Sequence, residues 1–322
     1  MTRRTRRIIL IGAVLFFVLV TPAVLFYAWG YSFDWQNKKI VLTGGIYLKS
    51  VPKKADVYIN NQIQKEITPT FIKRLLPKEY QIKVTKQGYH PWQKNLKVES
   101  KIVTEAKNIL LIPFNPEIET INQELPVNFS LKDFIQEEPN IIFYIQEPSY
   151  ILYKTDKENS FQEQISLTSL PINHQYQIFT SINEQIAVLD ENKQLYLLNP
   201  EMKTFELINQ NVQGLQFSND NKLLYFTPSE IWVYYLNRKN NQQELITRLS
   251  QEIKQAIWYN KTNEHIIFSV GQNIKITELD VRNGRNTNDL IELNFNQMAY
   301  NEKNKLLYLV KDKQLLSISL EE

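Results

Sequence analysis

Few side chains in this sequence could carry out chemistry. The three histidines, His90, His174 and His265, lie far apart along the chain, and there is no cysteine to bind a metal or form a disulfide. The sequence contains no glycine-rich phosphate loop, no Gly-x-Ser-x-Gly motif and no calcium loop of alternating aspartates. We therefore expect the histidines to be structural or exposed, and we expect no metal or cofactor site.

Cleavage of a glycosidic bond would need a pair of carboxylates on either side of the sugar. The segments that we place at the centre of the C-terminal half contain a single carboxylate, Asp133. Because one carboxylate cannot fill both roles, we expect that the chain is not an enzyme. The same segments carry glutamines that either bind a polar ligand or peptide or line a solvated channel. These are Gln175, Gln177, Gln213, Gln216, Gln255 and Gln297.

The central segments belong to a repeat that occupies residues 114–322. Its clearest copies, 212–247, 253–293 and 295–320, read as short strands separated by turns, and two weaker copies precede them. The second strands recur every 37–45 residues, close to the spacing of four-stranded propeller blades. They begin near Ile141, Ile186, Leu223, Ile266 and Leu306. The predicted innermost strands are 129–135, 175–182, 212–218, 253–259 and 295–301.

The ends of the repeat region predict how it closes. The last copy has only three strands, and Glu117–Asn122 resembles the missing fourth. Pairing of the two ends would complete a five-bladed β-propeller and protect its sheet edges. Phe217, Tyr259 and Tyr300 share one column of the last three copies, as packing between blades requires. A pair of β-sandwiches or an open β-solenoid is the alternative fold.

The turns of the repeat region resemble those of TolB-like and WD-type propeller repeats. Ser218-Asn219-Asp220-Asn221 stands where those repeats more usually have Ser-Pro-Asp-Gly. The chain has only 8 glycines, which is few for an all-β protein, so many turns must be built from Asn, Asp, Lys and Glu.

The N-terminus predicts a membrane anchor. The run from Ile8 to Gly30 carries no charge and is long enough to cross a bilayer. Aromatic residues at its outer end, among them Trp29 and Trp35, fit an interfacial belt. The positive-inside rule places the N-terminus in the cytoplasm and residues 32–322 outside it. The arginines that set this orientation are Arg3, Arg4, Arg6 and Arg7.

A cleaved signal peptide is the alternative interpretation of the same segment. Its apolar region would be about 7–15 residues long and would end at a small-x-small cleavage site. The apolar run here is longer, and the best site, Ala28-Trp29-Gly30, has a bulky central residue. An uncleaved anchor is therefore the favoured interpretation.

Residues 45–113 alternate apolar and polar side chains over about seven short strands, which predicts a small β-sandwich. In order and spacing this stretch resembles the PEGA domain family, although Pro-Glu-Gly-Ala reads Pro52-Lys53-Lys54-Ala55. The resemblance implies an extracytoplasmic sandwich of bacterial envelope proteins with no activity of its own. The residues that carry it are Pro52, Ala55, Val57, Tyr58, Thr68, Pro69, Leu76, Tyr80, Val84, Gly88 and Tyr89.

Charge divides the chain into a basic and an acidic part. Residues 32–113 hold 15 Lys and Arg against 6 Asp and Glu, a net +9, whereas residues 114–322 hold 18 against 28, a net −10. The basic part favours anionic surfaces such as lipid headgroups or wall polymer, or its lysines simply keep the sandwich soluble. Nucleic acid is not an expected partner, because the basic part faces outward and the distal part is acidic.

Together these patterns predict an all-β, single-pass membrane protein. Its expected parts are a cytoplasmic stub (1–7), a transmembrane helix (8–30), a linker (31–44), a PEGA-like sandwich (45–113) and a propeller (114–322). The main hypothesis is an interaction platform for an envelope protein. The alternatives are a module that binds or anchors to anionic wall polymer and, least favoured, an enzyme that acts on glycans.

Overall fold

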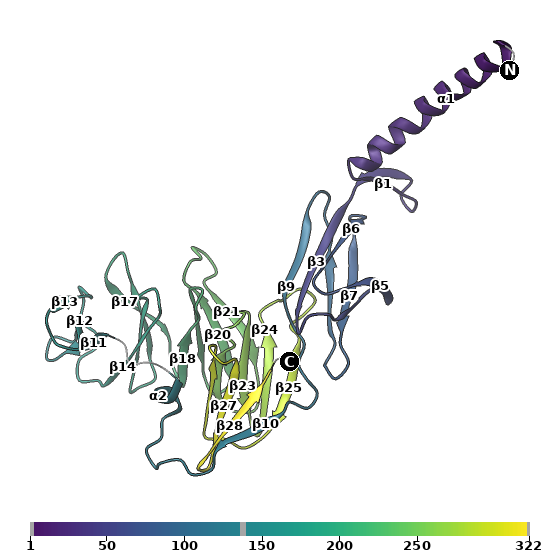
Figure 1. The fold of residues 1–322 in the computed structure, drawn as a ribbon. Coiled ribbons are helices and arrows are strands. Elements are labelled where there is room, and N and C mark those ends of the chain that lie inside the picture. Colours follow the sequence, from purple (N-terminus) through teal and green to yellow (C-terminus); the bar gives the residue numbers. More distant parts are fainter. Residues whose placement is uncertain (1–2, 136–139, 321–322) are drawn as a thin grey trace. The chain divides into compact units, whose positions relative to one another are not determined.

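The computed structural model describes residues 3–135 and 140–320, which form two compact units. Unit 1 contains the residues up to Leu111 together with Arg282–Gly284. Unit 2 contains Ile112–Val281 and the residues from Arg285 onward. Apart from helices α1 and α2, the regular structure of the described residues is β-strand (Figure 1).

Unit 1 begins with helix α1 (Arg3–Ala28). The helix starts within the arginine-rich segment rather than at Ile8, because arginine is a good helix former and nothing there breaks the helix. In the described chain, α1 is the helix that is long and apolar enough to cross a membrane. None of its described side chains is buried within the protein, so its apolar surface is free to contact lipid.

The segment 31–44, which we expected to be a linker, contains a β-hairpin. Strand β1 (Tyr31–Asp34) pairs antiparallel with β2 (Lys39–Leu42). The turn between them is stabilised by Asp34, whose Oδ1 accepts hydrogen bonds from the N–H groups of Gln36 and Asn37 at 3.0 and 3.2 Å. Its strands are only four residues long, which is too short for a clear alternating pattern in the sequence.

Seven strands form the predicted β-sandwich as two sheets, ordered β6-β3-β9 and β5-β4-β7-β8. All neighbours pair antiparallel except β3 and β9, which run parallel. The strands are β3 (Gly44–Val51), β4 (Asp56–Ile59), β5 (Gln62–Ile67), β6 (Thr70–Leu75), β7 (Glu79–Thr85), β8 (Trp92–Lys97) and β9 (Val103–Leu110).

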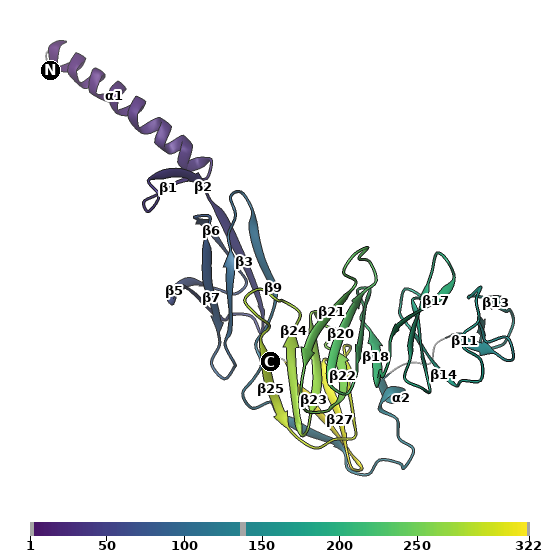
Figure 2. The same ribbon diagram turned by 180° about the vertical axis from the view of Figure 1, so that it is seen from behind.

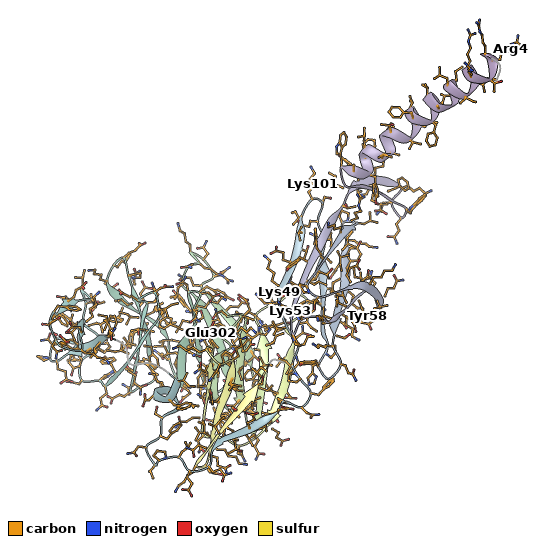
Figure 3. The ribbon with its side chains drawn as sticks, in the orientation of Figure 1. Arg4, Lys49, Lys53, Tyr58, Lys101 and Glu302 are labelled. Carbon is orange, nitrogen blue, oxygen red and sulfur yellow. The ribbon has the colours of Figure 1, made fainter. Side chains whose placement is uncertain are left out.

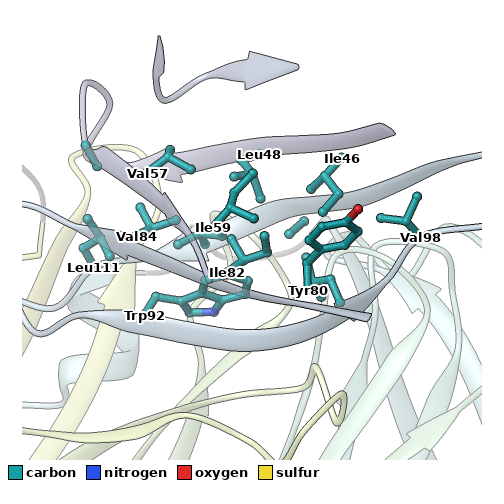
Figure 4. Close-up of a cluster of buried hydrophobic side chains, with 14 of the residues drawn as sticks. Ile46, Leu48, Val57, Ile59, Tyr80, Ile82, Val84, Trp92, Val98 and Leu111 are labelled. Carbon is teal, nitrogen blue, oxygen red and sulfur yellow. The ribbon is translucent and has the colours of Figure 1, made fainter. Parts of the chain in front are cut away.

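The core of the sandwich lies between its two sheets. Figure 4 shows Ile46 and Leu48 of β3 facing Ile82 and Val84 of β7, and all four side chains are fully buried. They alternate with exposed or half-buried residues, Tyr47 and Lys49 in β3 and Lys83 and Thr85 in β7, which is the period of two that the sequence displayed. Trp92 closes the core and is also buried.

Unit 2 consists, in its described residues, of five antiparallel sheets that follow one another along the chain (Figures 1 and 2). Its first strand, β10 (Ile118–Asn122), pairs with its last, β28 (Gln314–Ser319), as predicted. The other strands are β11 (Ile141–Gln146), β12 (Ile151–Asp156), β13 (Glu163–Gln164), β14 (Tyr176–Thr180), β15 (Ile186–Asp190), β16 (Leu195–Asn199), β17 (Thr204–Asn209), β18 (Gly214–Phe217), β19 (Lys222–Phe226), β20 (Glu230–Tyr235), β21 (Gln243–Arg248), β22 (Ile253–Trp258), β23 (His265–Val270), β24 (Asn273–Glu278), β25 (Thr287–Glu292), β26 (Gln297–Asn301) and β27 (Leu306–Lys311).

The prediction of an innermost strand at 129–135 is wrong. This segment contains the short helix α2 (Leu131–Ile135), and the sheet that follows it has three strands in the described part of the chain, β11-β12-β13. Ser130 caps the helix by accepting a hydrogen bond from the N–H of Asp133 at 3.3 Å. The Ser130 to Ile135 segment thus has a start signal for a helix and no period of two.

Non-glycine residues occupy the left-handed conformation in the turns, as the scarcity of glycine predicted. Glu184, Asn221, Asn263 and Lys305, which lie between the first and second strands of four sheets, have φ angles of 55°, 65°, 52° and 62°. Asn tolerates this conformation better than most residues, because its short side chain can hydrogen-bond locally.

Candidate functional site

The PEGA-like motif of unit 1 is a buried hydrogen-bonded cluster at the crossing between the two sheets. The Thr68 Oγ1 accepts a hydrogen bond from the N–H of Ala55 at 3.0 Å and lies 2.6 Å from the Oγ of Ser50. The Ser50 hydroxyl also donates to the carbonyl of Pro52 at 2.6 Å. Thr68 and Ser50 are buried, so the motif residues hold the fold rather than a ligand.

Thr68→Val is expected to lower the free energy of unfolding by about 1–3 kcal/mol, because it leaves the buried N–H of Ala55 without an acceptor. Thr68→Ser keeps the hydroxyl and should cost less. Thr70→Val is the control, since Thr70 is half-buried. Urea titration of the three variants checks this prediction, and equal effects at positions 68 and 70 would contradict it.

The other motif residues are also structural. Val57 and Val84 are fully buried, and the hydroxyl of Tyr80 donates to the carbonyl of Leu76 at 3.1 Å. Burial is the main reason that the pKa of Tyr80 is raised. Gly88 has a φ of +87°, as its predicted turn requires. Pro52 and Tyr89 are buried, Tyr58 is half-buried, and Pro69 is exposed.

The basic residues of the sandwich are spread over both sheets rather than gathered in one pocket. Lys49 and Lys107 lie on the sheet β6-β3-β9, and Lys65 and Lys83 lie on the other. The Lys83 ammonium lies 5.9 Å above the ring of Tyr58. A distribution of this kind fits an extended anionic surface better than a single small ligand.

The residues that we considered for chemistry are not brought together. Asp133 is exposed on α2 and faces no second carboxylate on the described innermost strands β14, β18, β22 and β26. His174 Nδ1 lies 3.0 Å from Asp190, while His265 is buried with its Nδ1 2.9 Å from the hydroxyl of Thr262. His90 belongs to unit 1. The described residues contain no group of three or more potential metal ligands.

Three of the central glutamines bond a neighbouring segment instead of lining a channel, and two of them, Gln216 and Gln255, bridge neighbouring sheets. The side chain of Gln216 (β18) accepts a hydrogen bond from the N–H of Trp258 (β22) at 2.7 Å. The carbonyl of Gln216 accepts a second bond from Nε1 of Trp258 at 3.0 Å. Gln255 (β22) bonds both the N–H and the carbonyl of Met298 (β26), at 2.9 and 2.7 Å.

Gln297 (β26) repeats this arrangement with the segment that contains α2. Its Oε1 accepts a hydrogen bond from the N–H of Leu131 at 2.8 Å, and its Nε2 donates to the carbonyl of Phe129 at 3.3 Å. Gln175, Gln177 and Gln213 are exposed. The bridging role was not visible in the sequence, because each bond joins residues at least 42 positions apart.

Four turns form one connected polar surface. They lie between β14 and β15, β18 and β19, β22 and β23, and β26 and β27. We call this surface the turn face; it consists of residues 181–185, 218–222, 260–264 and 301–305. The Nδ2 of Asn183 donates to the Oδ1 of Asn221 at 2.9 Å. Asn219 bonds both Asn263, at 3.2 Å, and Glu302, at 2.8 Å. Hydrogen bonds therefore link all four turns.

Lys222 holds two turns of this surface together through hydrogen bonds of its buried ammonium group. Its ammonium donates to Asp220 at 2.7 Å, to Glu264 at 2.8 Å and to the carbonyl of Asn263 at 2.7 Å, which uses all three of its N–H groups. Its side chain is only 9% exposed, and it also lies 5.8 Å above the ring of Trp258. Because every donor is satisfied, Lys222 orders the turn face and is not available to a ligand.

Comparison with known proteins agrees with the fold of unit 1. Residues 43–110 match the model of the PEGA domain family. No curated protein matches the sequence.

Solved structures that match the chain include the β-propeller proteins Hsv2 and YCF48, at low sequence identity. Hsv2 of Kluyveromyces lactis is 15% identical, with 87% of this chain and 75% of that one covered and a TM-score of 0.43. YCF48 bound to a D1 peptide is 12% identical, with 86% and 94% covered and a TM-score of 0.41. YCF48 from Cyanidioschyzon merolae is 9% identical, with 86% and 98% covered and a TM-score of 0.40. Residues 43–110 of this chain are a PEGA domain, and the region that follows matches β-propeller structures.

Proposed function

We propose that this chain is a single-pass membrane protein of the bacterial envelope, without catalytic activity. Helix α1 holds the PEGA domain and a five-bladed propeller on the extracytoplasmic side, and the propeller binds a partner protein. The arginines Arg3, Arg4, Arg6 and Arg7 keep the N-terminus in the cytoplasm.

The five-bladed arrangement is supported by contacts between successive sheets. The pairing of β10 with β28 joins the two ends of unit 2 in one sheet. In this arrangement helix α2 would take the place of the innermost strand of the first blade. Two contacts support this position: Leu131 bonds Gln297 of β26, and the ammonium of Lys132 lies 5.8 Å from the centre of the Phe179 ring in β14. Among the described residues, this helix would then bridge the last and second blades in place of a fifth inner strand.

The turn face is the observation that carries the proposed binding role. Its four turns are already cross-linked by hydrogen bonds, so a partner would not have to order them, and preorganisation lowers the entropic cost of binding. Ile182 lies in the first of these turns and is 73% exposed, and the next residue, Asn183, is polar and bonds Asn221. An exposed apolar residue within a polar rim is typical of a protein interface.

Ile182→Arg is expected to weaken binding of the partner by about tenfold or more, because a charge would replace an apolar anchor. The matched control is Leu207→Arg, which places the same charge on an exposed leucine of the outermost strand β17. The partner is captured by cross-linking full-length protein in its native membrane, and its affinity is then measured for both variants. Equal affinities for the two variants would contradict the proposal.

A second candidate function is binding of an anionic wall polymer by unit 1. It is favoured by the excess of 15 Lys and Arg over 6 Asp and Glu in residues 32–113. Such binding would be mainly electrostatic and should be lost when the salt concentration is raised from about 0.1 to 1 M. Sedimentation of the protein with purified wall polymer at both salt concentrations tests it, and salt-insensitive or absent binding counts against it.

A further inference from the structure

One face of the hairpin β1–β2 is apolar along its whole length. Phe33 pairs with Ile40 and Tyr31 pairs with Leu42, and directly paired residues point to the same face of a sheet. Trp35 continues this face, with its ring centroid 4.7 Å from that of Phe33. Trp35 is 81% exposed, Ile40 57% and Phe33 40%. We call these five residues the apolar hairpin face.

The opposite face of the hairpin is mainly polar. It carries Ser32, Asp34 and Lys39 together with one apolar residue, the half-buried Val41, and Lys38 precedes Lys39 in the turn. Hydrogen bonds from the side chain and N–H of Asn37 lower the pKa of Asp34, so its carboxylate stays charged. A two-stranded hairpin is at best marginally stable in water. One with an exposed apolar face needs a surface to cover that face.

The apolar hairpin face is continuous with the end of the membrane helix. The Tyr31 ring packs edge-on against Phe26 of α1, with ring centroids 5.3 Å apart, and Phe26 also contacts Trp29. The hairpin is held there by Thr43, whose N–H and Oγ1 donate to the carbonyl of Gly30 at 2.9 and 2.8 Å. A medium that covers the apolar sides of α1 would therefore also cover the apolar hairpin face.

The edge of the sandwich next to α1 is basic and contacts the helix directly. Gly44 pairs with Leu75 and Gly45 with Lys73, which leaves Arg74 as the extra residue of a β-bulge with a φ of 62°. Bulges redirect side chains. Here the bulge places the Arg74 guanidinium 3.5 Å above the ring of Tyr27, in the last turns of α1.

Lys101 belongs to the same edge. It lies beside the end of α1, whereas Arg4 lies at the far end of the helix (Figure 3). Its N–H donates to the carbonyl of Thr43 at 3.0 Å, so the turn that carries it is tied to the base of the hairpin. Cations at the end of an apolar helix are placed to meet anionic lipid headgroups.

We propose that the apolar hairpin face lies in the headgroup–acyl boundary of the leaflet from which α1 emerges, while Lys38, Lys39, Arg74 and Lys101 contact anionic phospholipid headgroups. The hairpin is thus a second, in-plane anchor that fixes the PEGA domain against the bilayer. Amphipathic surface elements sink their apolar side about 5–10 Å into this boundary. This inference rests on the proposed function, because it requires α1 to span the membrane.

Single cysteines test the depth of each face, since the chain has none of its own. Ile40→Cys labels the apolar hairpin face and Lys39→Cys, its neighbour, labels the polar face. Val24→Cys labels α1. Each full-length variant carries an environment-sensitive fluorophore in vesicles of phosphatidylcholine with about one quarter phosphatidylglycerol, and quenching by lipids spin-labelled near the headgroup is measured.

We expect quenching of the label at position 40 to be at least about twice as strong as quenching of the label at position 39, because only position 40 lies below the headgroups. Phe33→Cys, on the paired strand, should behave like Ile40→Cys and guards against misfolding of one variant. Suppose that lipids labelled along the acyl chain quench position 24, while lipids labelled near the headgroup quench positions 39 and 40 equally. This result would overturn the in-plane anchor but would still support α1 as the membrane-spanning helix. Absence of quenching at position 24 from lipids labelled along the acyl chain would overturn both proposals.

Discussion

Trp258→Ala is expected to lower the free energy of unfolding of unit 2 by about 3–5 kcal/mol. The Trp258 side chain is fully buried among residues from β19, β20, β22 and β23, so its removal leaves a large cavity. It also removes the Nε1 donor to the carbonyl of Gln216, which joins two neighbouring sheets. Urea-induced loss of the far-ultraviolet circular dichroism of strands, compared between variant and parent, measures the effect.

Two further variants separate packing from hydrogen bonding at this junction. Trp258→Phe keeps most of the volume and loses only the indole donor, so we expect a cost of about 1–2 kcal/mol. Gln216→Ala leaves the main-chain N–H of Trp258 unpaired and should cost about 1–3 kcal/mol. Because the two residues touch, the double variant should show a coupling energy of about 0.5 kcal/mol or more. A cost below about 1 kcal/mol for Trp258→Ala would show that the sheets do not depend on this junction.

Much of unit 2 could be predicted from the sequence, because local patterns determine where its strands begin. The second strands predicted at Ile141, Ile186 and Leu306 start at those residues, and those predicted at Leu223 and Ile266 start one residue earlier. Alternation of apolar residues and turns rich in Asn and Lys carry this information. The predicted packing of the aromatic column is confirmed for two of its three members, since the rings of Tyr259 and Tyr300 lie 4.7 Å apart and both are buried.

The features that escaped prediction depend on contacts between distant residues or on very short elements. The sequence does not distinguish a glutamine that faces solvent from one that bonds the next sheet. Gln216 meets Trp258 only because the two sheets pack side by side in the folded chain. The expected strand at 129–135 followed from extending the repeat to its first copy, where α2 replaces it. The sequence predicts only an aromatic belt that includes Tyr31 and Trp35, because these residues share a face with Phe33, Ile40 and Leu42 only after the chain turns.

Acid is expected to destabilise unit 2 through His265. This side chain is buried, and desolvation of its charged form lowers its pKa from 6.5 to about 3. Between these two values the unfolded chain binds one proton more at this site than the folded chain, so stability falls as the pH falls, by about 1.4 kcal/mol per pH unit. Between pH 6.5 and pH 4.5 protonation at this site lowers the free energy of unfolding by about 2–3 kcal/mol in total.

His265→Gln isolates this contribution, because glutamine is polar but does not titrate. Thr262 can still hydrogen-bond the new side chain, and the packing against Tyr259 is partly retained. The carboxylates that also take up protons in acid are common to both proteins, so their effect cancels in the comparison. We expect the free energy of unfolding to fall less steeply between pH 6.5 and 4.5 in His265→Gln, by about 1 kcal/mol per pH unit or more. Parallel pH profiles for the two proteins would mean that His265 is protonated in the folded state and that the site is open to water.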